Sequence, residues 1–404
     1  MTAGLEMTIG ERIELLRRRR GLSRQTLASL VGYSSEWLRQ VERKGRQVDR
    51  LSTLLRLAQV LHVKDVAAFM GVAVPQEKVE ELTQGGEPDI RAALLGQRTA
   101  AAAGAAIRPG DLSRLGDDVD GVWRSWHESA QRYSRVRARL PGLLSRVYGC
   151  HAWHSARQAL PLSAQVHRLT SAFLHSTGEL PHALLAADRA LAEARQAGDA
   201  LLAAACLRSF GDVLLRLHSS GQARELCVTE ADGLRRHGEV STAEGEAERT
   251  WLYLTAAEAA AFQQDHHEAE RLMDTAEELA AGICGSEIRI ATPVTPVDVA
   301  AHRVRVEAVL GRTARALRLA EQVQEVNALH REGRVRFYLT LARTHLQARD
   351  QSGAVLALMQ ADRDCGEEMR CNVYARHLLR QAISQDSVTV RRDLHQLAES
   401  AGIM

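Results

Sequence analysis

The stretch that decides the fold is RQTLASLVGYSSEWLRQVER, residues 24–43. It predicts two short helices around a tight turn, because the small Ala28 permits a close crossing and Gly32 supplies backbone freedom between the helices. Ser23 and Ser34 precede the two helices, where a serine hydroxyl accepts a hydrogen bond from an unpaired first-turn amide. Both helix starts are therefore marked in the sequence.

Helical patterns flank this pair on both sides. Thr8 and Glu11 have the spacing of a capping box that opens a helix running to about Arg20. Apolar residues then repeat at helical spacing from Leu51 to Leu61. Four or five helices in about 65 residues predict a compact helical bundle.

Residues 21–63, GLSRQTLASLVGYSSEWLRQVERKGRQVDRLSTLLRLAQVLHV, resemble the Cro/repressor (XRE) family of helix-turn-helix domains. The resemblance covers residues 8–72 and rests on the turn pattern, the Val41-Glu42-Arg43 ending and the Leu-rich helix that follows. It implies a domain that inserts its second helix into the major groove of a double-stranded DNA operator. Trp37 is unusually bulky for this family, and either packing on the bundle or contact with thymine methyl groups would suit it.

The resemblance also implies roles for individual residues. The second helix would meet base edges, where Arg suits guanine, Gln suits adenine and Glu suits cytosine. The expected base-contacting residues are Ser35, Glu36, Arg39 and Gln40. The expected phosphate-contacting residues are Arg24, which replaces the glutamine often found there, and Arg43, Lys44 and Arg46 in the loop after the helix.

Charge is concentrated in the same part of the chain. Residues 8–72 contain 13 basic and six acidic residues, a net charge of +7, whereas the whole chain carries only +2. With Glu6 set apart, residues 73–404 therefore carry a net charge of −4. A basic module beside an acidic remainder is typical of a polyanion binder. The alternative is that the run Arg17–Arg20 is only a solvated face in an arginine-rich sequence.

Composition bounds the remaining classes of function. With 404 residues, 45% hydrophobic and 25% charged, the chain is expected to form two or three globular domains in the cytoplasm. It has no long apolar stretch, and no signal pattern precedes the first helix, so we expect no membrane partner. It also lacks a Gly-rich phosphate loop, a nucleophile elbow and an HExxH motif. We therefore expect neither enzymatic activity nor a cofactor.

A linker is expected over residues 73–118, between the small domain and a long helical region at residues 119–404. Pro75, the GlyGlyGluPro stretch at 85–88 and Pro109-Gly110 interrupt regular structure there. The Ala-rich run in between predicts some helix, because alanine has the highest helix propensity.

The long region carries five recurrent turns. They lie at Thr177-Gly178, Ser220-Gly221, Gln264-Asp265, Leu310-Gly311 and Arg349-Asp350, which are 43, 44, 46 and 39 residues apart. A small residue follows each turn, at Ala183, Ala223, Ala269, Ala314 and Ala354. Small residues let two antiparallel helices approach each other closely. One pair of helices cannot bury its apolar face alone, so stacked helical hairpins are expected. A bundle of unrelated helices is the alternative.

This region resembles degenerate tetratricopeptide (TPR) repeats, so the predicted fold class is all-α: a helix-turn-helix bundle followed by an α-solenoid of TPR-like hairpins. The pairing resembles quorum-sensing regulators whose repeats bind a signal peptide, and actinomycete regulators of development and antibiotic production. Asparagines often clamp the peptide in the first group. Because Asn327 and Asn372 are the only asparagines, peptide sensing has no direct support.

The most aromatic segment, residues 123–154, is the candidate effector site. Its candidate binding residues are Trp123, Trp126, His127, Tyr148 and Trp153. Aromatic side chains could stack on a peptide or small molecule on the concave inner face of a solenoid. The alternative is that they form the core of the first hairpin. Cys150, His151 and His154 offer only three metal ligands, so no metal site is predicted.

Two functions remain. The first is a homodimeric transcription regulator that reads two half-sites and responds to an effector, with control of development or secondary metabolism as the role that the resemblance implies. The second is a protein-docking scaffold with only nonspecific affinity for DNA. Sequence specificity discriminates between them, because a regulator should prefer its operator about 10³-fold or more over bulk DNA.

Overall fold

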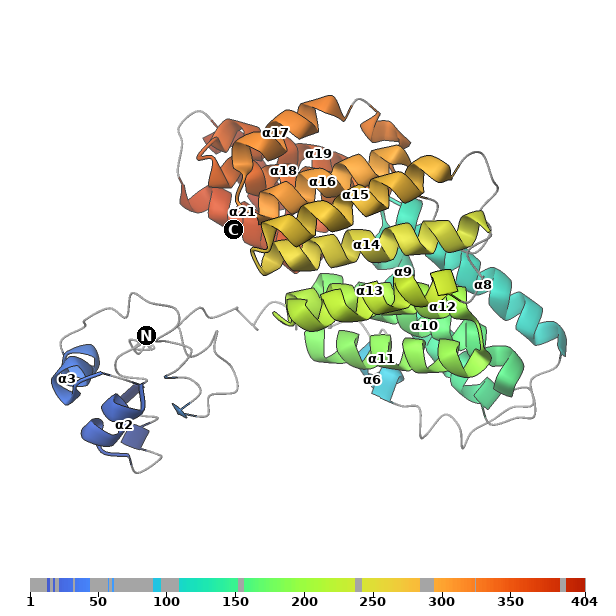
Figure 1. Cartoon of the computed structure of the whole chain (residues 1–404), viewed down its shortest axis with the longest axis horizontal. Coiled ribbons are helices and arrows are strands. Elements are labelled where there is room, and N and C mark those ends of the chain that lie inside the picture. Colours follow the sequence, from blue (N-terminus) through green and yellow to red (C-terminus); the bar gives the residue numbers. More distant parts are fainter. Residues whose placement is uncertain are drawn as a thin grey trace. The chain divides into compact units, whose positions relative to one another are not determined.

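A computed structural model gives the structure of this protein. It describes residues 13–14, 17–18, 22–31, 33–43, 57, 60–61, 90–95, 109–151, 156–236, 242–283, 294–323, 325–385 and 390–403. The chain divides into two compact units, Met1–Glu87 and Pro88–Met404 (Figure 1). Every regular element in the described ranges is a helix. None of these helices combines the length and apolar character that a bilayer crossing demands.

The first unit contains the predicted helix pair, α2 (Arg24–Val31) and α3 (Ser35–Arg43). Both predicted caps are confirmed. The backbone amide of Thr26 donates to Ser23 Oγ, and that of Trp37 donates to Ser34 Oγ, both at 3.1 Å. The pair encloses an apolar core with nearby described residues: Ile13, Leu27, Ala28, Val31, Leu38, Val41, Leu57 and Leu61. Ala28 is only 1% exposed, as the close crossing of the two helices requires.

The second unit is built from long helices that pair in chain order. They are α6 (Ile90–Leu95), α8 (Pro109–Glu128), α9 (Arg132–His151), α10 (Ala156–Thr177), α11 (Leu180–Ala197), α12 (Ala200–Arg216), α13 (Ser220–Arg236), α14 (Ala243–Phe262), α15 (His266–Gly282), α16 (Pro296–Val309), α17 (Thr313–Gln322), η4 (Val326–Ala328), α18 (Arg331–Gln347), α19 (Gln351–Asp364), α20 (Glu368–Cys371), α21 (Val373–Ser384) and α22 (Arg391–Ser400). Both α6 and the first ten residues of α8 fall within the range predicted as a linker, 73–118.

Five helical hairpins, α10–α11 through α18–α19, form around turns with left-handed backbone. The turn residues are Gly178, His218, Gln264, Gly311 and Arg349, with φ between 58° and 88°. Four turns lie where they were predicted. The second lies at His218 and Ser219, and the predicted Ser220-Gly221 instead begins α13.

Alanines close to the turns allow the paired helices to approach. Ala183, Ala223, Ala269 and Ala354 are fully buried, as predicted. In the fourth hairpin the prediction was wrong, because Ala314 is exposed and Ala316 takes the buried position. The local helix phase of α17 turns Ala314 toward solvent.

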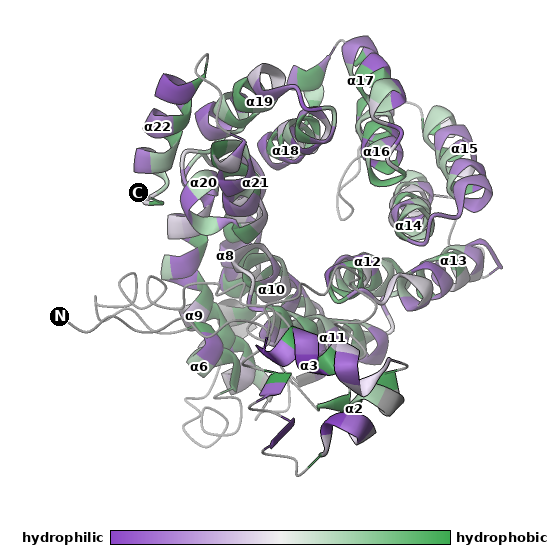
Figure 2. Ribbon diagram, turned by 90° about the vertical axis from the view of Figure 1, so that its left-hand side faces the viewer, coloured by the Kyte–Doolittle hydropathy of each residue, from purple (hydrophilic) through white to green (hydrophobic). Residues whose placement is uncertain are grey.

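The hairpins form two curved layers. Figure 2 shows α10, α12, α14, α16 and α18 on the inside of the curve and their partner helices outside. Neighbouring inner helices contact one another from α10 through to α18. The predicted α-solenoid is therefore confirmed for the second unit.

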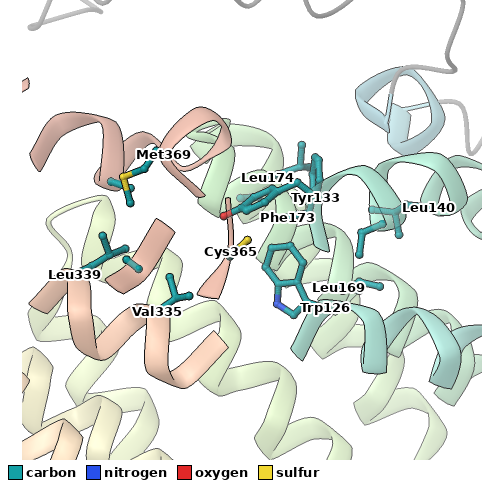
Figure 3. Close-up of a cluster of buried hydrophobic side chains, with 14 of the residues drawn as sticks. Trp126, Tyr133, Leu140, Leu169, Phe173, Leu174, Val335, Leu339, Cys365 and Met369 are labelled. Carbon is teal, nitrogen blue, oxygen red and sulfur yellow. The ribbon is translucent and has the colours of Figure 1, made fainter. Parts of the chain in front are cut away.

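The two ends of this array meet. One continuous apolar core joins α8, α9 and α10 to α18, α20 and α21. In Figure 3, Trp126, Tyr133 and Phe173 lie near Val335 and Met369, with Cys365 between them. The array is thus closed into a ring. The sequence predicts a concave solenoid but not this closure.

Polar contacts reinforce this junction, which we call the seam. Arg132 Nη2 donates to Glu368 Oε2 at 2.7 Å, and both side chains are nearly inaccessible to solvent. The Tyr133 hydroxyl donates to the other oxygen of Glu368 at 3.2 Å. His127 Nδ1 lies 2.8 Å from Glu332 Oε2. These contacts join residues more than 200 positions apart in the chain.

Candidate DNA-binding helix and inner groove

Helix α3 has one apolar side and one polar side. Leu38 and Val41 are buried in the core of the first unit. The predicted base-contacting residues are Ser35, Glu36, Arg39 and Gln40, and their spacing places them on one face of the helix. Ser35 and Glu36 are exposed, and Arg39 and Gln40 are half-buried. The structure therefore brings these four residues together on a surface that a DNA groove could reach.

Glu36 organises this face. Arg39 donates two hydrogen bonds to the carboxylate of Glu36, at 2.7 and 2.6 Å. Gln40 Nε2 donates to the same carboxylate at 3.3 Å. The side chains of Arg39 and Glu36 are 43% and 55% exposed, so this pair is weak and easily exchanged for other partners.

Arg24, a predicted phosphate contact, is tied to the protein itself. Its Nε donates to Glu42 Oε2 at 2.6 Å, and its Nη2 lies 3.5 Å from Glu14 Oε1. Glu42 is buried and also accepts two hydrogen bonds from Arg17, at 2.7 and 3.1 Å. Arg24 therefore helps to join α2 to α3, and only a third of its side chain is exposed.

Arg43, the next predicted phosphate contact, lies at the end of α3. Its side chain is 58% exposed, and its Nη2 lies 3.4 Å from Glu14 Oε1. Burial would raise the pKa of Glu14, but the charges of Arg18, Arg43 and Arg24 outweigh it and lower that pKa. The remaining predicted phosphate contacts, Lys44 and Arg46, lie outside the described residues.

Trp37 packs on the bundle. Its ring stacks on Tyr33, with centroids 4.1 Å apart and an angle of 21° between the planes. Of the two roles considered for this residue, the structure supports packing within the first unit.

The second unit contains a cavity of about 340 Å³ on the inner face of the ring, which we call the inner groove. Helices α8, α10, α12, α14, α16 and α18 supply most of its lining, and none comes from the outer helices of the hairpins. Its size lies within the range of small-molecule sites, about 300–1,000 Å³.

The five candidate effector-binding residues separate. Trp123, Trp126 and His127 line the inner groove. Trp126 is only 2% exposed and also belongs to the apolar core of the seam. Tyr148 is buried away from the groove, with its hydroxyl 3.0 Å from His167 Nε2, so it serves the core of the first helices. Trp153 lies outside the described residues.

The inner groove is rich in arginine. Its lining includes seven arginines and five carboxylates: Arg132, Arg168, Arg208, Arg216, Arg305, Arg336 and Arg343, with Asp212, Glu258, Asp298, Glu332 and Glu368. Three ion pairs form among them. Besides Arg132–Glu368, Arg305 pairs with Glu258 at 2.7 Å and Arg336 with Glu332 at 2.8 Å.

Three further arginines lie over aromatic rings. The guanidinium carbon of Arg168 is 4.3 Å from the centroid of Trp123. The corresponding distances are 5.0 Å from Arg208 to Trp251 and 5.6 Å from Arg216 to Tyr374. Such cation–π contacts hold the planar guanidinium groups in fixed orientations.

Two histidines of the groove, His175 and His302, have lowered pKa values, mainly because they are buried. Burial, together with the charges of Arg216 and Arg336, lowers the pKa of His175 to about 3. Burial and the charge of Arg336 lower the pKa of His302 to about 4. Both imidazoles are therefore neutral at physiological pH, and neither contributes to the positive charge.

A regular spacing that was not among the sequence-based predictions marks the groove. The residue six positions before each left-handed turn residue lines the groove in all five hairpins: Ala172, Asp212, Glu258, Arg305 and Arg343. Arg168 and Arg208 each lie ten positions before their turns. Alignment of the repeats on these turns would have located the inner face. Among the described residues, no group of histidine, cysteine and carboxylate side chains is placed to hold a metal ion.

Comparison with known proteins gives one family match, which lies within the first unit. Residues 8–69 match a helix-turn-helix domain family. A crystal structure of Bacillus thuringiensis PlcR in complex with the peptide PapR7 and DNA is similar at 12% sequence identity and a TM-score of 0.34, covering 86% of this chain and 98% of that one. No curated protein matches this chain. The chain thus carries a helix-turn-helix domain followed by an array of helical hairpins.

Proposed function

We propose that this protein is a sequence-specific DNA-binding transcriptional regulator whose helical array dimerises and binds an effector in the inner groove. The polar face of α3 carries this proposal. Ser35, Glu36, Arg39 and Gln40 lie together on the side of the helix opposite to the buried Leu38 and Val41. The match of residues 8–69 to a helix-turn-helix family supports the same function.

Binding to DNA would exchange internal ion pairs for contacts with the duplex. Glu36 holds Arg39, and Glu14 faces Arg43, but Arg39 and Arg43 are both substantially exposed. Exposed ion pairs contribute about 0–1 kcal/mol, so their replacement by base or phosphate contacts costs little. Arg24 is better placed to orient α3 than to contact phosphate, because it bonds the buried Glu42.

A homodimer would place two copies of α3 about 34 Å apart, one turn of the duplex, to read two half-sites. The effector would act by favouring one separation of these helices. An effector that bound both separations equally would leave DNA binding unchanged, however tightly it bound.

The decisive experiment is selection of genomic DNA fragments bound by the full-length protein, repeated with and without cell extract. We expect one enriched sequence with paired half-sites, preferred about 10³-fold or more over bulk DNA. Sedimentation velocity on the bound complex should give two protein chains per operator.

A matched pair of variants tests the assigned surface. R39A should relax the enriched sequence at one base pair, whereas R195Q should leave it unchanged, because Arg195 lies on the outer helix α11 and is 55% exposed. Equal affinity of the wild-type protein for all fragments would instead support a docking scaffold with nonspecific DNA affinity.

A further inference from the structure

We infer that the inner groove takes an amphipathic effector whose oxyanion, a carboxylate or a phosphate, is bound by Arg168 and Arg208 while its apolar part lies against Trp123 and Trp251. This inference rests on the proposed function only in treating the groove as the effector site.

The first support is the balance of charge in the groove. Three of the seven arginines form ion pairs with Glu258, Glu332 and Glu368. Of the two remaining carboxylates, Asp298 is engaged outside these pairs, in the capping box of α16 with Thr295. In total, the described lining residues include seven arginines and only five carboxylates, an excess of two positive charges. This excess of positive charge favours an anionic ligand.

The second support is the unsatisfied hydrogen-bond donor of Arg168. Its Nε atom is buried and has no hydrogen-bond partner in the described part of the chain. Burial lowers the pKa of this guanidinium, and the charge of Arg208 lowers it further. A buried donor on a cation is costly unless it is bonded. A bound oxyanion would supply the missing acceptor, and the planar guanidinium fork matches a carboxylate or phosphate.

Glu248 is the carboxylate that competes with this interpretation, because its charge acts on both Arg168 and Arg208. It is 1% exposed and does not line the groove. Neither of its oxygens has a hydrogen-bond partner within the described residues, so it does not occupy the N–H groups of Arg168. Glu248 offsets charge from a distance and leaves the guanidinium fork available to a ligand.

The third support is the aromatic part of the lining. Trp123 and Trp251 lie beside the two arginines, and Phe262 lines the same cavity although its side chain is 41% exposed. A large apolar side chain open to solvent inside a concave site favours an apolar partner. The ligand therefore combines an apolar body with an anionic group.

Isothermal titration calorimetry on the full-length protein tests this inference with matched probes. Indole-3-acetate and indole-3-acetamide share one ring and differ in the carboxylate. We expect the acid to bind at least tenfold more tightly than the amide. Phenyl phosphate, in a third titration, identifies the preferred oxyanion by comparison with the carboxylate.

The variants locate the binding. R168Q should weaken binding of the acid by at least tenfold and leave binding of the amide within twofold. R168K, which retains the charge but loses the fork, should fall between R168Q and wild type. R195Q, on the outer layer, should bind both probes as wild type does.

Equal affinity of the wild-type protein for the acid and the amide would overturn the inference. This comparison needs no variant, so it remains informative even if R168Q does not fold. Unchanged binding of the acid to R168Q would also overturn it. Either failure would leave the fragment selection intact, which separates this inference from the proposed DNA-binding function.

Discussion

Arginine is used differently in the two units of this chain. On α3, Arg39 and Arg43 are about half exposed, and each lies beside a glutamate on the same surface. In the inner groove, Arg168 and Arg208 lie over tryptophan rings on the inner helices. The first arrangement can be broken at little cost in free energy, because water already solvates the charges. The second fixes the guanidinium groups before any ligand arrives.

This difference teaches how one residue type can serve two kinds of anion. A duplex is a large polyanion that meets an open surface, so exposed and exchangeable arginines suit it. A small ligand has few contacts, so binding gains from groups that are already oriented. The first unit also contains a buried pair, Arg17–Glu42, which provides an internal reference for the exposed pairs.

The largest expected effect contrasts buried and exposed pairs within the first unit. E42A should destabilise that unit by about 3–5 kcal/mol, because it leaves Arg17 buried without its partner. E36A, which removes an exposed carboxylate, should change stability by less than about 1 kcal/mol. Chemical denaturation of the full-length protein, followed by circular dichroism, measures both. Similar losses would remove the distinction between the two kinds of pair.

The next effect concerns DNA specificity. R39A should reduce discrimination at one base pair of the selected operator by about 1–3 kcal/mol, because a bidentate arginine contact is lost. Its stability should remain near that of the wild type, since the pair with Glu36 is exposed. Binding assays on operators mutated one base pair at a time measure this change. A uniform loss across all sequences would contradict the assignment of Arg39 to a base.

A third effect sharpens the view of the seam in the second unit. Burial would raise the pKa of Glu332, but the hydrogen bond with His127 and the charge of Arg336 hold it well below its usual value. The ionised form therefore stabilises the fold above the unfolded-state pKa of about 4.3. As the pH falls toward the folded-state pKa, protonation of Glu332 removes this stabilisation. The total loss is about 1.4 kcal/mol for each unit by which folding lowers the pKa.

Urea denaturation at pH 7, 5, 4 and 3 checks this expectation. E332Q should flatten the acid-induced loss of stability, whereas E277Q should not, because Glu277 is 47% exposed in its pair with Arg303. Parallel profiles for the wild type and E332Q would show that the seam does not depend on this carboxylate.

The smallest effect concerns phosphate contacts. R43A should weaken binding to every DNA sequence alike and reduce the slope of log affinity against log salt by about one. Binding titrations at several salt concentrations provide this slope, with R195Q as the control on the outer layer. If R43A altered base preference in the same way as R39A, the division between base and phosphate contacts would be wrong.

Local signals in the sequence predicted much of the fold. Ser23 and Ser34 cap the helices that they were expected to cap, because an N-cap acts within three residues of itself. Four of five hairpin turns were located from Gly or Asp beside a helix end. The second was displaced because the left-handed position is taken by His218, a residue that gives no turn signal of its own.

The seam and the groove depend on contacts that no local pattern encodes. Arg132 and Glu368 are 236 positions apart, and the sequence offers many arginines and glutamates that could pair. Aromatic clustering at residues 123–154 pointed to a site, but it did not separate Trp123 in the groove from Tyr148 in the core. The assignment of base contacts on α3 stays a prediction.

Closure of the second unit constrains how it can move. In an open stack of hairpins, each pair can tilt against the next, because the free end of the stack can move to accommodate the tilt. Here Arg132 and Tyr133 of α9, which precedes the first hairpin, bond Glu368 of α20, which follows the last, so the two ends of the array are joined. A tilt of one hairpin must be matched by shifts of the other hairpins in the ring, or it must strain the bonds between Arg132, Tyr133 and Glu368. A ligand that displaces any one inner helix should therefore displace the other inner helices as well.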